Sequence, residues 1–480
     1  MKNNNEIFNN LPILKVLKKY NESSPVAFHM PGHKLGKGFD IEEFNAIGKY
    51  DVTEIPGTDN LHYPEEAIKE AQELAAKAFG AEKTFFLVNG STCGIHAAIM
   101  ALCKEGDKLI VSRDCHKSVI GGLMLAKAMP IYIKPKMDKT FKIPLGSDID
   151  AIIRVMDENR DAVGVLITRP TYYGICCDIE RLVLEAHKRG MVVIVDEAHG
   201  AHLKFSNQLP ICAMDAGADI CIQSAHKTLP ALTQTALLHT KGQKVDRERL
   251  AFYLRLLQTS SPSYLFLCSI DYARAVMEHS GSQLLKELQR NVISFEENFI
   301  ENEFYTIRKE KIDGYENDFT RLVINTSKLG ITGYKVEKIL RQNFNIQIEM
   351  SDYYNIVCIL TVSDELQDLE RLSNALKSIA IKFRENATLS DIKIEELTIL
   401  SKGSVIINEF MESELLPLYK ANGRVCGDII TPYPPGIPYI CPGEIIMADS
   451  IELLYNIVNV GGKVNGLSAE GLIKVIKGGR

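Results

Sequence analysis

The segment Asn89–Gly94 has the residue types of an anion site. It follows the apolar stretch Phe85–Val88 and opens a helical pattern over Ile95–Cys103. Backbone N–H groups and the hydroxyls of Ser91 and Thr92 would face an anion there, because a helix start carries unpaired donors and the positive end of its dipole. The same residues could serve only as an ordinary helix cap.

An acidic residue, Asp196, directly follows the apolar residues 191–195. Buried carboxylates are rare unless they are paired, so Asp196 needs a cationic partner such as a metal ion or a protonated ring nitrogen. His199 and His202 could complete a metal site with Asp196, or they could pack without a ligand. A lone aspartate at a strand end could also do no more than cap a helix.

Lys227 ends the group Ser224–Lys227, which follows the predicted strand Asp219–Gln223. Most lysines are solvated surface groups, but partial burial would favour the neutral amine, which forms a Schiff base with an aldehyde. A fourth polar group, Asp114–Ser118, follows another apolar stretch. Its His116 could stack on an aromatic ring, transfer protons or simply cap a helix.

Together these four groups supply an anion cradle, an acid for a ring nitrogen, a lysine for an aldehyde and an aromatic face. Those are the needs of pyridoxal 5′-phosphate. An acid that keeps the pyridine nitrogen protonated lets the ring take up the electrons left when a bond at the substrate Cα breaks. The sequence therefore predicts pyridoxal 5′-phosphate as the cofactor and no metal.

The elements that must position these groups alternate apolar strands with helical patterns between about residues 64 and 240, as in βα units around a mainly parallel sheet. Helices over Pro64–Phe79 and Asp178–Arg189 predict an α/β core with helices on both faces of the sheet. The predicted strands are Phe85–Val88, Leu109–Ser112, Ile131–Lys134, Ala162–Thr168, Met191–Val195, Asp219–Gln223 and Thr235–His239.

Beyond residue 270 we expect a second, smaller α/β unit. Its predicted helices are Gly281–Glu303 and Glu365–Ile381, and its strands are Leu322–Asn325 and Ile356–Val362. The segment Ile429–Glu444 contains five prolines, which excludes a helix or a central strand and predicts an ordered loop or a linker.

Composition excludes several classes of protein. The 480 residues are 46% hydrophobic and 24% charged, as in globular proteins, and the net charge of −6 without a long basic run argues against nucleic acid as a partner. No apolar run reaches the ~18 residues of a membrane span, the first residues lack the pattern of a secretory signal, and the eleven cysteines form no C-x-x-C pair. We expect a reduced, cytoplasmic protein that does not bind membranes.

Common catalytic signatures are also missing. The sequence has no G-x-x-x-x-G-K-[ST], no G-x-G-x-x-G after a strand, no H-E-x-x-H and no G-x-S-x-G. This argues against P-loop ATPases, Rossmann dehydrogenases, zincins and serine hydrolases.

The sequence resembles the ornithine/lysine/arginine decarboxylases, a family of fold-type I pyridoxal-phosphate enzymes. This resemblance implies an aminotransferase-like α/β fold with a smaller C-terminal α/β domain. It also implies decarboxylation of lysine, arginine or ornithine to the amine, in polyamine metabolism. The matching stretches are Phe28–Lys34, Asp51–Glu54, Asp59–His62, Asn89–Gly94, Asp114–Ser118, Asp196–His199, Ser224–Leu229, Ser260–Tyr264, Tyr433–Pro438 and Pro442–Glu444.

The resemblance implies roles for individual residues. Lys227 would bind the cofactor aldehyde, and Asp196 would pair with the pyridine nitrogen. His116 would stack on the ring, and Glu444 would face the distal cationic end of the substrate. Further cofactor-binding residues are expected at Ser91, Thr92, His199, Ser224 and His226, of which all but His199 would hold the phosphate.

The resemblance also predicts the organisation of the chain. We expect an N-terminal segment (1–63), a large cofactor-binding domain (64–270), a small α/β domain (271–390) and a C-terminal decarboxylase domain (391–480). Larger family members carry an N-terminal wing domain, which we do not expect here because the motif around His29 begins almost at once. Family members place the active site between two subunits, so a homodimer or a higher homo-oligomer is expected.

Three other functions stay open on the residues alone. An aminotransferase would clamp the substrate carboxylate with an arginine, for which Arg321 and Arg424 are candidates. A metal-dependent hydrolase would use Asp196, His199 and His202. A non-catalytic binding protein would keep the fold without needing both the lysine and the acid.

Overall fold

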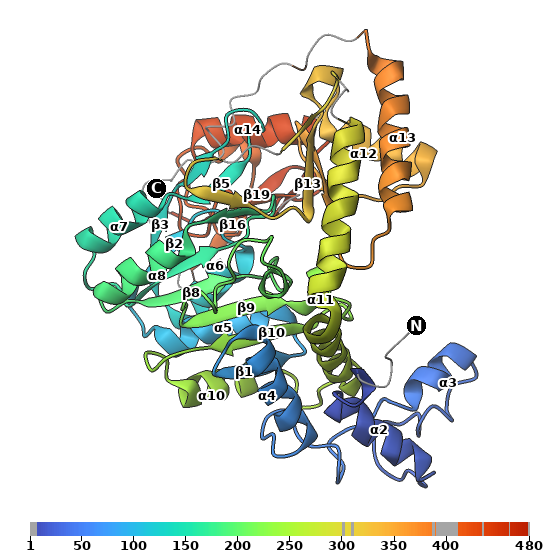
Figure 1. Cartoon of the computed structure of the whole chain (residues 1–480). Helices are drawn as coiled ribbons and strands as arrows, with labels where there is room; N and C mark the ends of the chain where they lie inside the picture. The colour runs from blue at the N-terminus through green and yellow to red at the C-terminus, as the bar shows by residue number, and fades with distance from the viewer. Residues whose placement is uncertain are drawn as a thin grey trace. The chain divides into compact units, whose positions relative to one another are not determined.

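The computed structural model describes residues 7–299, 303–308, 312–385, 389, 411–433, 436–459 and 461–478. Figure 1 shows its helices and strands, coloured by residue number. The chain divides into two compact units, each made of separate stretches of chain. The first unit is Met1–Leu102 with Val192–Lys286, and the second is Cys103–Met191 with Glu287–Arg480. No helix of the described residues is long and apolar enough to cross a membrane.

The first unit has four neighbouring strands in the order β1-β10-β9-β8. Strands β8 and β9 are parallel, whereas β10 runs antiparallel to both β9 and β1. Strands β1, β8 and β9 therefore all end at the same edge of the sheet. The strands are β1 (Lys83–Leu87), β8 (Val192–Asp196), β9 (Ile220–Ser224) and β10 (Ala236–Thr240).

The helices of the first unit include one whose start is fixed by a distant carboxylate. The Oδ2 atom of Asp59 accepts hydrogen bonds of 2.9 Å from the N–H groups of Glu66 and Ile68, at the start of α4. Burial opposes the ionisation of Asp59, but these and other backbone N–H groups hold its pKa below the usual value. The helices are α2 (Pro12–Glu22), α3 (Glu42–Gly48), α4 (Ala67–Phe79), α5 (Gly90–Leu102), α9 (Ala225–Thr228), α10 (Arg247–Leu257) and the part of α11 (Tyr264–Phe299) up to Lys286, with a 3₁₀ turn at Leu203–Phe205.

Helix α11 corrects the predicted helix Gly281–Glu303, because it already begins at Tyr264. Gly281 lies inside the helix and does not start it. A Cβ atom at Gly281 would lie 3.0 Å from Met277 Cε and 3.1 Å from Phe205 Cβ, so close packing explains the glycine at this position. The residues from 300 to 302 lie outside the described part of the chain.

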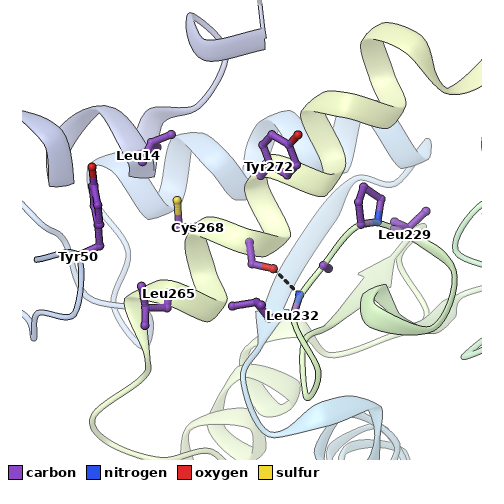
Figure 2. A pocket seen from close by; sticks show the side chains of 10 residues that line it. Leu14, Tyr50, Leu229, Leu232, Leu265, Cys268 and Tyr272 are labelled. Carbon is purple, nitrogen blue, oxygen red and sulfur yellow. Dashed lines mark hydrogen bonds between the residues drawn. The ribbon is translucent and has the colours of Figure 1, made fainter. Parts of the chain in front are cut away.

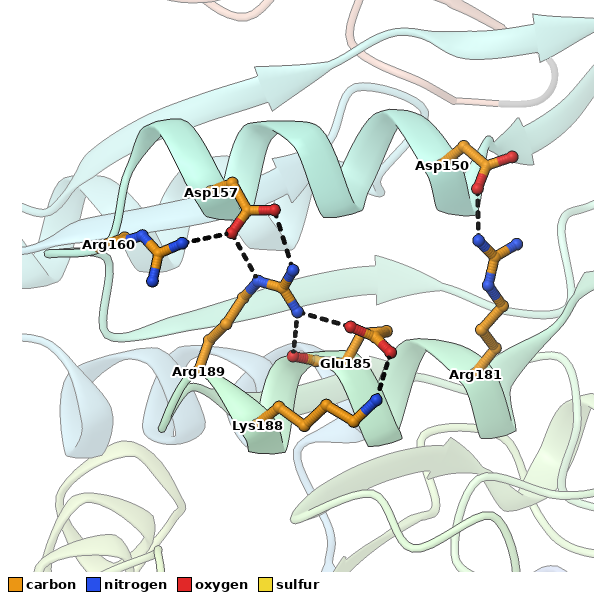
Figure 3. A network of polar contacts seen from close by, with 7 residues as sticks. All are labelled: Asp150, Asp157, Arg160, Arg181, Glu185, Lys188 and Arg189. Carbon is orange, nitrogen blue, oxygen red and sulfur yellow. Dashed lines mark hydrogen bonds and ion pairs between the residues drawn. The ribbon is translucent and has the colours of Figure 1, made fainter.

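The second unit contains three parallel strands in the order β6-β2-β3. Helices α7 and α8 are joined by a polar network in which Arg189 lies between Asp157 and Glu185 (Figure 3). The elements are β2 (Lys108–Ser112), α6 (Lys117–Ala126), β3 (Met129–Ile133), β4 (Pro135–Met137), β5 (Pro144–Ser147), α7 (Ile149–Glu158), β6 (Gly164–Thr168), β7 (Ile175–Cys177) and α8 (Ile179–Lys188).

The later part of the second unit has a four-stranded antiparallel sheet in the order β11-β13-β15-β14. Both strands predicted here, Leu322–Asn325 and Ile356–Val362, and the helix Glu365–Ile381 are found with shifted ends. The elements are β11 (Thr306–Ile307), β12 (Tyr315–Asn317, paired with β7), β13 (Arg321–Asn325), a 3₁₀ turn (Ser327–Leu329), α12 (Gly333–Phe344), β14 (Met350–Ser351), β15 (Asn355–Ile359) and α13 (Leu366–Phe383).

The C-terminal residues pack around a cluster of buried apolar side chains that includes Ile430, Ile440, Ile446 and Leu454. In the described residues of the proline-rich segment, 429–433 and 436–444, there is no helix, and Thr431–Tyr433 forms a short strand in a two-stranded sheet. The elements are β16 (Ser413–Pro417), a 3₁₀ turn (Leu418–Lys420), β17 (Thr431–Tyr433), α14 (Ala448–Asn459), β18 (Lys463–Asn465) and β19 (Leu472–Ile476).

Candidate active site

The turn after β1 forms the start of helix α5. The helix begins at Gly90 and not at the expected Ile95, so Ser91 and Thr92 lie in its first turn, where backbone N–H groups have no partner within the helix. Gly90 has a φ of +74°, which glycine adopts without strain. Gly94 lets the helix approach the sheet, because a Cβ atom there would lie 2.6 Å from Leu87 Cδ1. The sequence thus builds a helix N-terminus at the edge where the strands end.

Asp196 is the last residue of β8, and its side chain is almost entirely buried. Its Oδ1 atom accepts a hydrogen bond of 3.2 Å from the N–H of Ala198. Burial raises the pKa of Asp196, and the nearby charge of Lys227 works in the opposite direction. A further cation against this carboxylate would favour its ionised form.

Strand β9 and the short helix α9 position the lysine. Ser224 ends β9, and its hydroxyl donates a hydrogen bond of 3.0 Å to the hydroxyl of Ser91. Lys227 lies in α9, and its Nζ atom is 3.0 Å from Nε2 of His199. The Nδ1 atom of His226 lies 2.9 Å from the carbonyl oxygen of Thr235, and burial lowers the pKa of His226.

The structure therefore brings most of the predicted cofactor residues to one edge of the first unit. The hydroxyls of Ser91 and Ser224 are in contact. Lys227 contacts His199 and interacts with the buried Asp196. Thr92 belongs to the same helix turn but is exposed. These positions follow from the common edge at which β1, β8 and β9 end.

The hydrolase alternative finds no support in the site. Within the described ranges, no group of three or more His, Cys, Asp or Glu side chains could hold a metal ion. Asp196, His199 and His202 are all described and are all buried. Their spacing in the sequence does not produce a metal site.

The aminotransferase candidates both have carboxylate partners. A guanidinium nitrogen of Arg321 lies 3.8 Å from Asp318, and one of Arg424 lies 2.7 Å from Glu414. Arg424 also donates a hydrogen bond of 2.9 Å to the carbonyl oxygen of Ile476. Both arginines thus contact groups of the protein itself, and these contacts do not favour either one as a clamp for a substrate carboxylate.

His116 belongs to the second unit and is the N-cap residue of α6. Its Nδ1 atom accepts a hydrogen bond of 3.2 Å from the N–H of Ser118 and lies 2.8 Å from the hydroxyl of the same residue. The neighbouring Asp114 accepts a hydrogen bond from Ser112, and burial raises the pKa of Asp114. The capping role is thus observed, and stacking on the cofactor stays a prediction.

Glu444 is buried, with 4% of its surface exposed, and is paired with an arginine. Its Oε2 atom lies 3.1 Å from Nη2 of Arg113 and accepts a hydrogen bond of 2.7 Å from the N–H of Cys441. Arg113 also donates to the carbonyl oxygens of Pro438 and Tyr439. The loop from 436 to 444 is therefore held by contacts, and the predicted contact of Glu444 with the substrate stays a prediction.

Sequence reasoning missed Arg113 and a second acid, Glu197. Arg113 directly follows the apolar strand β2, and a charged residue at such a position needs a counter-ion. Glu197 follows Asp196, and its Oε2 atom accepts a hydrogen bond of 2.6 Å from the side-chain amide of Gln223. Both residues carried a sequence signal, but their partners lie too far along the chain to be found from spacing.

Solved structures with a similar fold are pyridoxal-phosphate enzymes of fold type I. Lysine decarboxylase A from Pseudomonas aeruginosa has a TM-score of 0.84 over 99% of this chain and 81% of that chain, with 19% identity. A serine palmitoyltransferase from Sphingomonas wittichii has a TM-score of 0.54 over 67% and 78%, with 15% identity. The predicted fold class is confirmed, including the C-terminal domain.

The sequence comparisons identify the family. The model of the Orn/Lys/Arg decarboxylase major domain matches residues 11–368, and that of the C-terminal domain matches residues 406–470. The arginine decarboxylase of Bacillus subtilis strain 168 is 39% identical over 97% of this chain and 98% of the relative, and that of Bacillus anthracis is 36% identical over 95% and 94%. The chain belongs to the Orn/Lys/Arg decarboxylase family. It is a pyridoxal-phosphate-dependent decarboxylase of basic amino acids, as the sequence predicted.

The residues of the first unit fit this cofactor. The start of α5 and the touching hydroxyls of Ser91 and Ser224 offer the donors that a phosphate needs. The buried carboxylate of Asp196 suits a protonated ring nitrogen, and Lys227 suits an aldehyde. These donors and acceptors are of the types that pyridoxal 5′-phosphate needs.

Proposed function

We propose that this protein decarboxylates L-arginine to agmatine and carbon dioxide, as a cytoplasmic enzyme of polyamine metabolism. Relatives that are 36% to 39% identical over nearly their whole length bear the name arginine decarboxylase, which favours arginine over lysine and ornithine. The observation that carries the chemistry is the cluster of Lys227, His199 and the buried Asp196 where strands β8 and β9 end.

Pyridoxal phosphate, when bound, supplies an electron-accepting ring that takes up the electrons left when the bond between Cα and the carboxylate breaks. Ser91, Thr92, Ser224 and His226 would hold its phosphate, and Lys227 would hold its aldehyde carbon. Asp196 would hold a proton on the pyridine nitrogen, because its buried carboxylate is stabilised by a cation.

His199 would orient the lysine. As an ammonium, Lys227 can only donate, and Nε2 of His199 would then accept the hydrogen bond across the contact of 3.0 Å. This contact would fix the position of the Nζ atom of Lys227.

Glu444 would recognise the distal guanidinium of arginine through a charge-assisted hydrogen bond. Its Oε2 atom already accepts from Arg113 and Cys441, and its Oε1 atom lies 3.4 Å from Nη2 of Arg113. The substrate would therefore share this carboxylate with Arg113, and Oε1 is the oxygen with the weaker existing contact.

The first unit has exposed apolar side chains and an apolar pocket that a homodimer would cover. Val26, Phe28 and Met30 are 76%, 92% and 69% exposed, and exposed apolar groups of this kind mark interaction surfaces. The same unit has a mostly apolar pocket of about 560 Å³, lined by Leu14, Tyr50, Leu229–Leu232 and residues of α11 (Figure 2). We propose that a second copy of the chain covers these apolar groups. Light scattering of the wild type beside Phe28→Asp tests this proposal, and a monomeric wild type would contradict it.

Product analysis tests the proposed reaction. Purified protein loaded with pyridoxal phosphate should release carbon dioxide and agmatine from arginine, with lower kcat/KM for lysine and ornithine. A keto acid in place of carbon dioxide would point to transamination. A higher kcat/KM for lysine or ornithine would overturn the choice of arginine.

A further inference from the structure

Four buried polar side chains form a continuous chain of hydrogen bonds across the strands of the first unit. Thr84 Oγ1 lies 2.8 Å from His239 Nδ1, His239 Nε2 lies 3.1 Å from Gln223 Oε1, and Gln223 Nε2 donates to Glu197 Oε2 at 2.6 Å. These residues belong to β1, β10, β9 and the position after β8, and all are fully or almost fully buried. The chain ends on a carboxylate.

Each hydrogen bond of this chain is donated in the same direction, from Thr84 towards Glu197. Because the Gln223 amide nitrogen donates to Glu197, its oxygen accepts from Nε2–H of His239. The Nδ1 atom of His239 then accepts from the hydroxyl of Thr84. Burial lowers the pKa of His239 to about 3, so the ring is neutral, as this arrangement requires.

The chain lies on the face of the sheet opposite to the cofactor residues. Successive side chains of a strand point to opposite faces, so Glu197 points away from the face of Asp196, and Gln223 away from that of Ser224. The ring of Phe79 stacks on His239 at 4.8 Å, whereas Gly94 of α5 packs near Ile222 on the other face. The two sets of residues are neighbours along the backbone but separated by the sheet.

Glu197 is also fixed by contacts besides Gln223. Its Oε1 atom accepts a hydrogen bond of 2.9 Å from the N–H of Ala213, and its Oε2 atom lies 3.3 Å from the thiol of Cys221. Its backbone N–H donates to the carbonyl oxygen of Ile222 at 2.9 Å, which continues the pairing of β8 with β9. Hydrogen bonds to a charged group are stronger than those between neutral groups.

We infer that Glu197 and Gln223 are positioning residues, which fix the ends of β8 and β9 from the far face of the sheet and so aim Asp196 and Lys227 at the cofactor. This inference rests on the roles proposed above for those two residues. Catalytic groups must be held within about 0.5 Å of their working geometry, and residues that lock the adjacent backbone supply that precision. If these hydrogen bonds were only structural, they would stabilise the fold without changing the titration of the bound cofactor.

The test uses the full protein loaded with pyridoxal phosphate. Gln223→Leu keeps the size of the side chain and removes its bonds to Glu197 and His239. We expect the midpoint pH of the visible absorbance titration of the bound cofactor to move by about half a unit or more. We also expect kcat to fall about tenfold while KM for arginine changes less than about twofold. Thr84→Val removes only the hydrogen bond from Thr84 to His239 and should change the titration midpoint and kcat less, in the same direction. This variant tests the inference if Gln223→Leu does not fold.

Asn325→Ala is the matched control, because it removes a buried side-chain hydrogen bond of 3.0 Å between β13 and β15, in the other sheet. It should lower Tm but leave the absorbance titration unchanged. If Gln223→Leu and Thr84→Val lower Tm in the same way and also leave the titration and kcat unchanged, the inference is overturned. A wild-type protein in which no lysine binds the cofactor would instead overturn the proposed function.

Discussion

The Nζ atom of Lys227 lies 3.0 Å from Nε2 of His199, and these residues follow two adjacent parallel strands, β9 and β8. Side chains that are 28 positions apart in the sequence therefore meet because the two strands end at the same edge. The buried Asp196 ends the same strand that leads to His199. This arrangement brings an amine, an imidazole and an acid together at one edge of the sheet.

The first prediction concerns Lys227. Lys227→Ala should fold but lose both the absorbance of the lysine-bound cofactor and turnover, because the amine that bonds to the aldehyde is gone. Borohydride reduction of the wild type followed by peptide mapping should place the label on Lys227. Lys204→Ala is a control, because Lys204 pairs with Asp215 at 2.6 Å and should not affect labelling. Label on another lysine would disprove the assignment.

The second prediction concerns Asp196. Asp196→Asn should still bind pyridoxal phosphate but lower kcat by orders of magnitude, since a neutral amide does not stabilise a protonated pyridine nitrogen. The measurements are cofactor absorbance and single-turnover rates. Chelators should leave the wild type fully active. Activity lost to a chelator and restored by zinc would favour the metal-dependent alternative.

These assignments show which parts of the site the sequence could predict. Asp196 directly follows an apolar stretch, and Lys227 ends a short polar group after another one. The edge of a parallel sheet gathers such positions, so local patterns were enough to predict that both residues lie at one edge, while their roles toward the cofactor stay predictions. The pairing of Arg113 with Glu444 joins residues that are 331 positions apart, and no periodicity reports such a contact. The start of α11 at Tyr264 was missed because Gly281 suggested a boundary, whereas packing against Phe205 explains that glycine.

The third prediction separates two roles of Glu444. Glu444→Gln should lower kcat/KM for arginine by about ten- to a hundredfold if the carboxylate binds the substrate, since a charge-assisted hydrogen bond contributes about 1.5 to 3 kcal/mol. The same change leaves Arg113 buried without its counter-ion, which costs about 3 to 5 kcal/mol of stability. Tm and steady-state kinetics on arginine, lysine and ornithine measure the two effects.

The double variant Arg113→Met with Glu444→Gln distinguishes these effects. Removing both charges should restore much of the lost stability, because neither group is left uncompensated. If Glu444 binds the guanidinium, kcat/KM for arginine should stay low in the double variant. Recovery of kcat/KM together with Tm would show that Glu444 acts only by holding the loop from 436 to 444.

The last prediction is a pH dependence of stability that originates in His239. Burial lowers the pKa of His239 to about 3 in the folded protein, from an ordinary value of 6.5, so the folded state binds this proton less readily than the unfolded state. The stability contributed by the neutral ring is complete above pH 6.5 and is lost as the pH falls towards 3, at up to about 1.4 kcal/mol per pH unit.

Calorimetric Tm values of wild type and His239→Gln between pH 7.5 and 4.5 measure this loss. The wild type should be the more stable protein at pH 7.5, because its ring bonds to Thr84 and Gln223, and its advantage should shrink steadily below pH 6.5. An advantage over His239→Gln that stayed constant across the range would show that His239 does not cause the acid sensitivity.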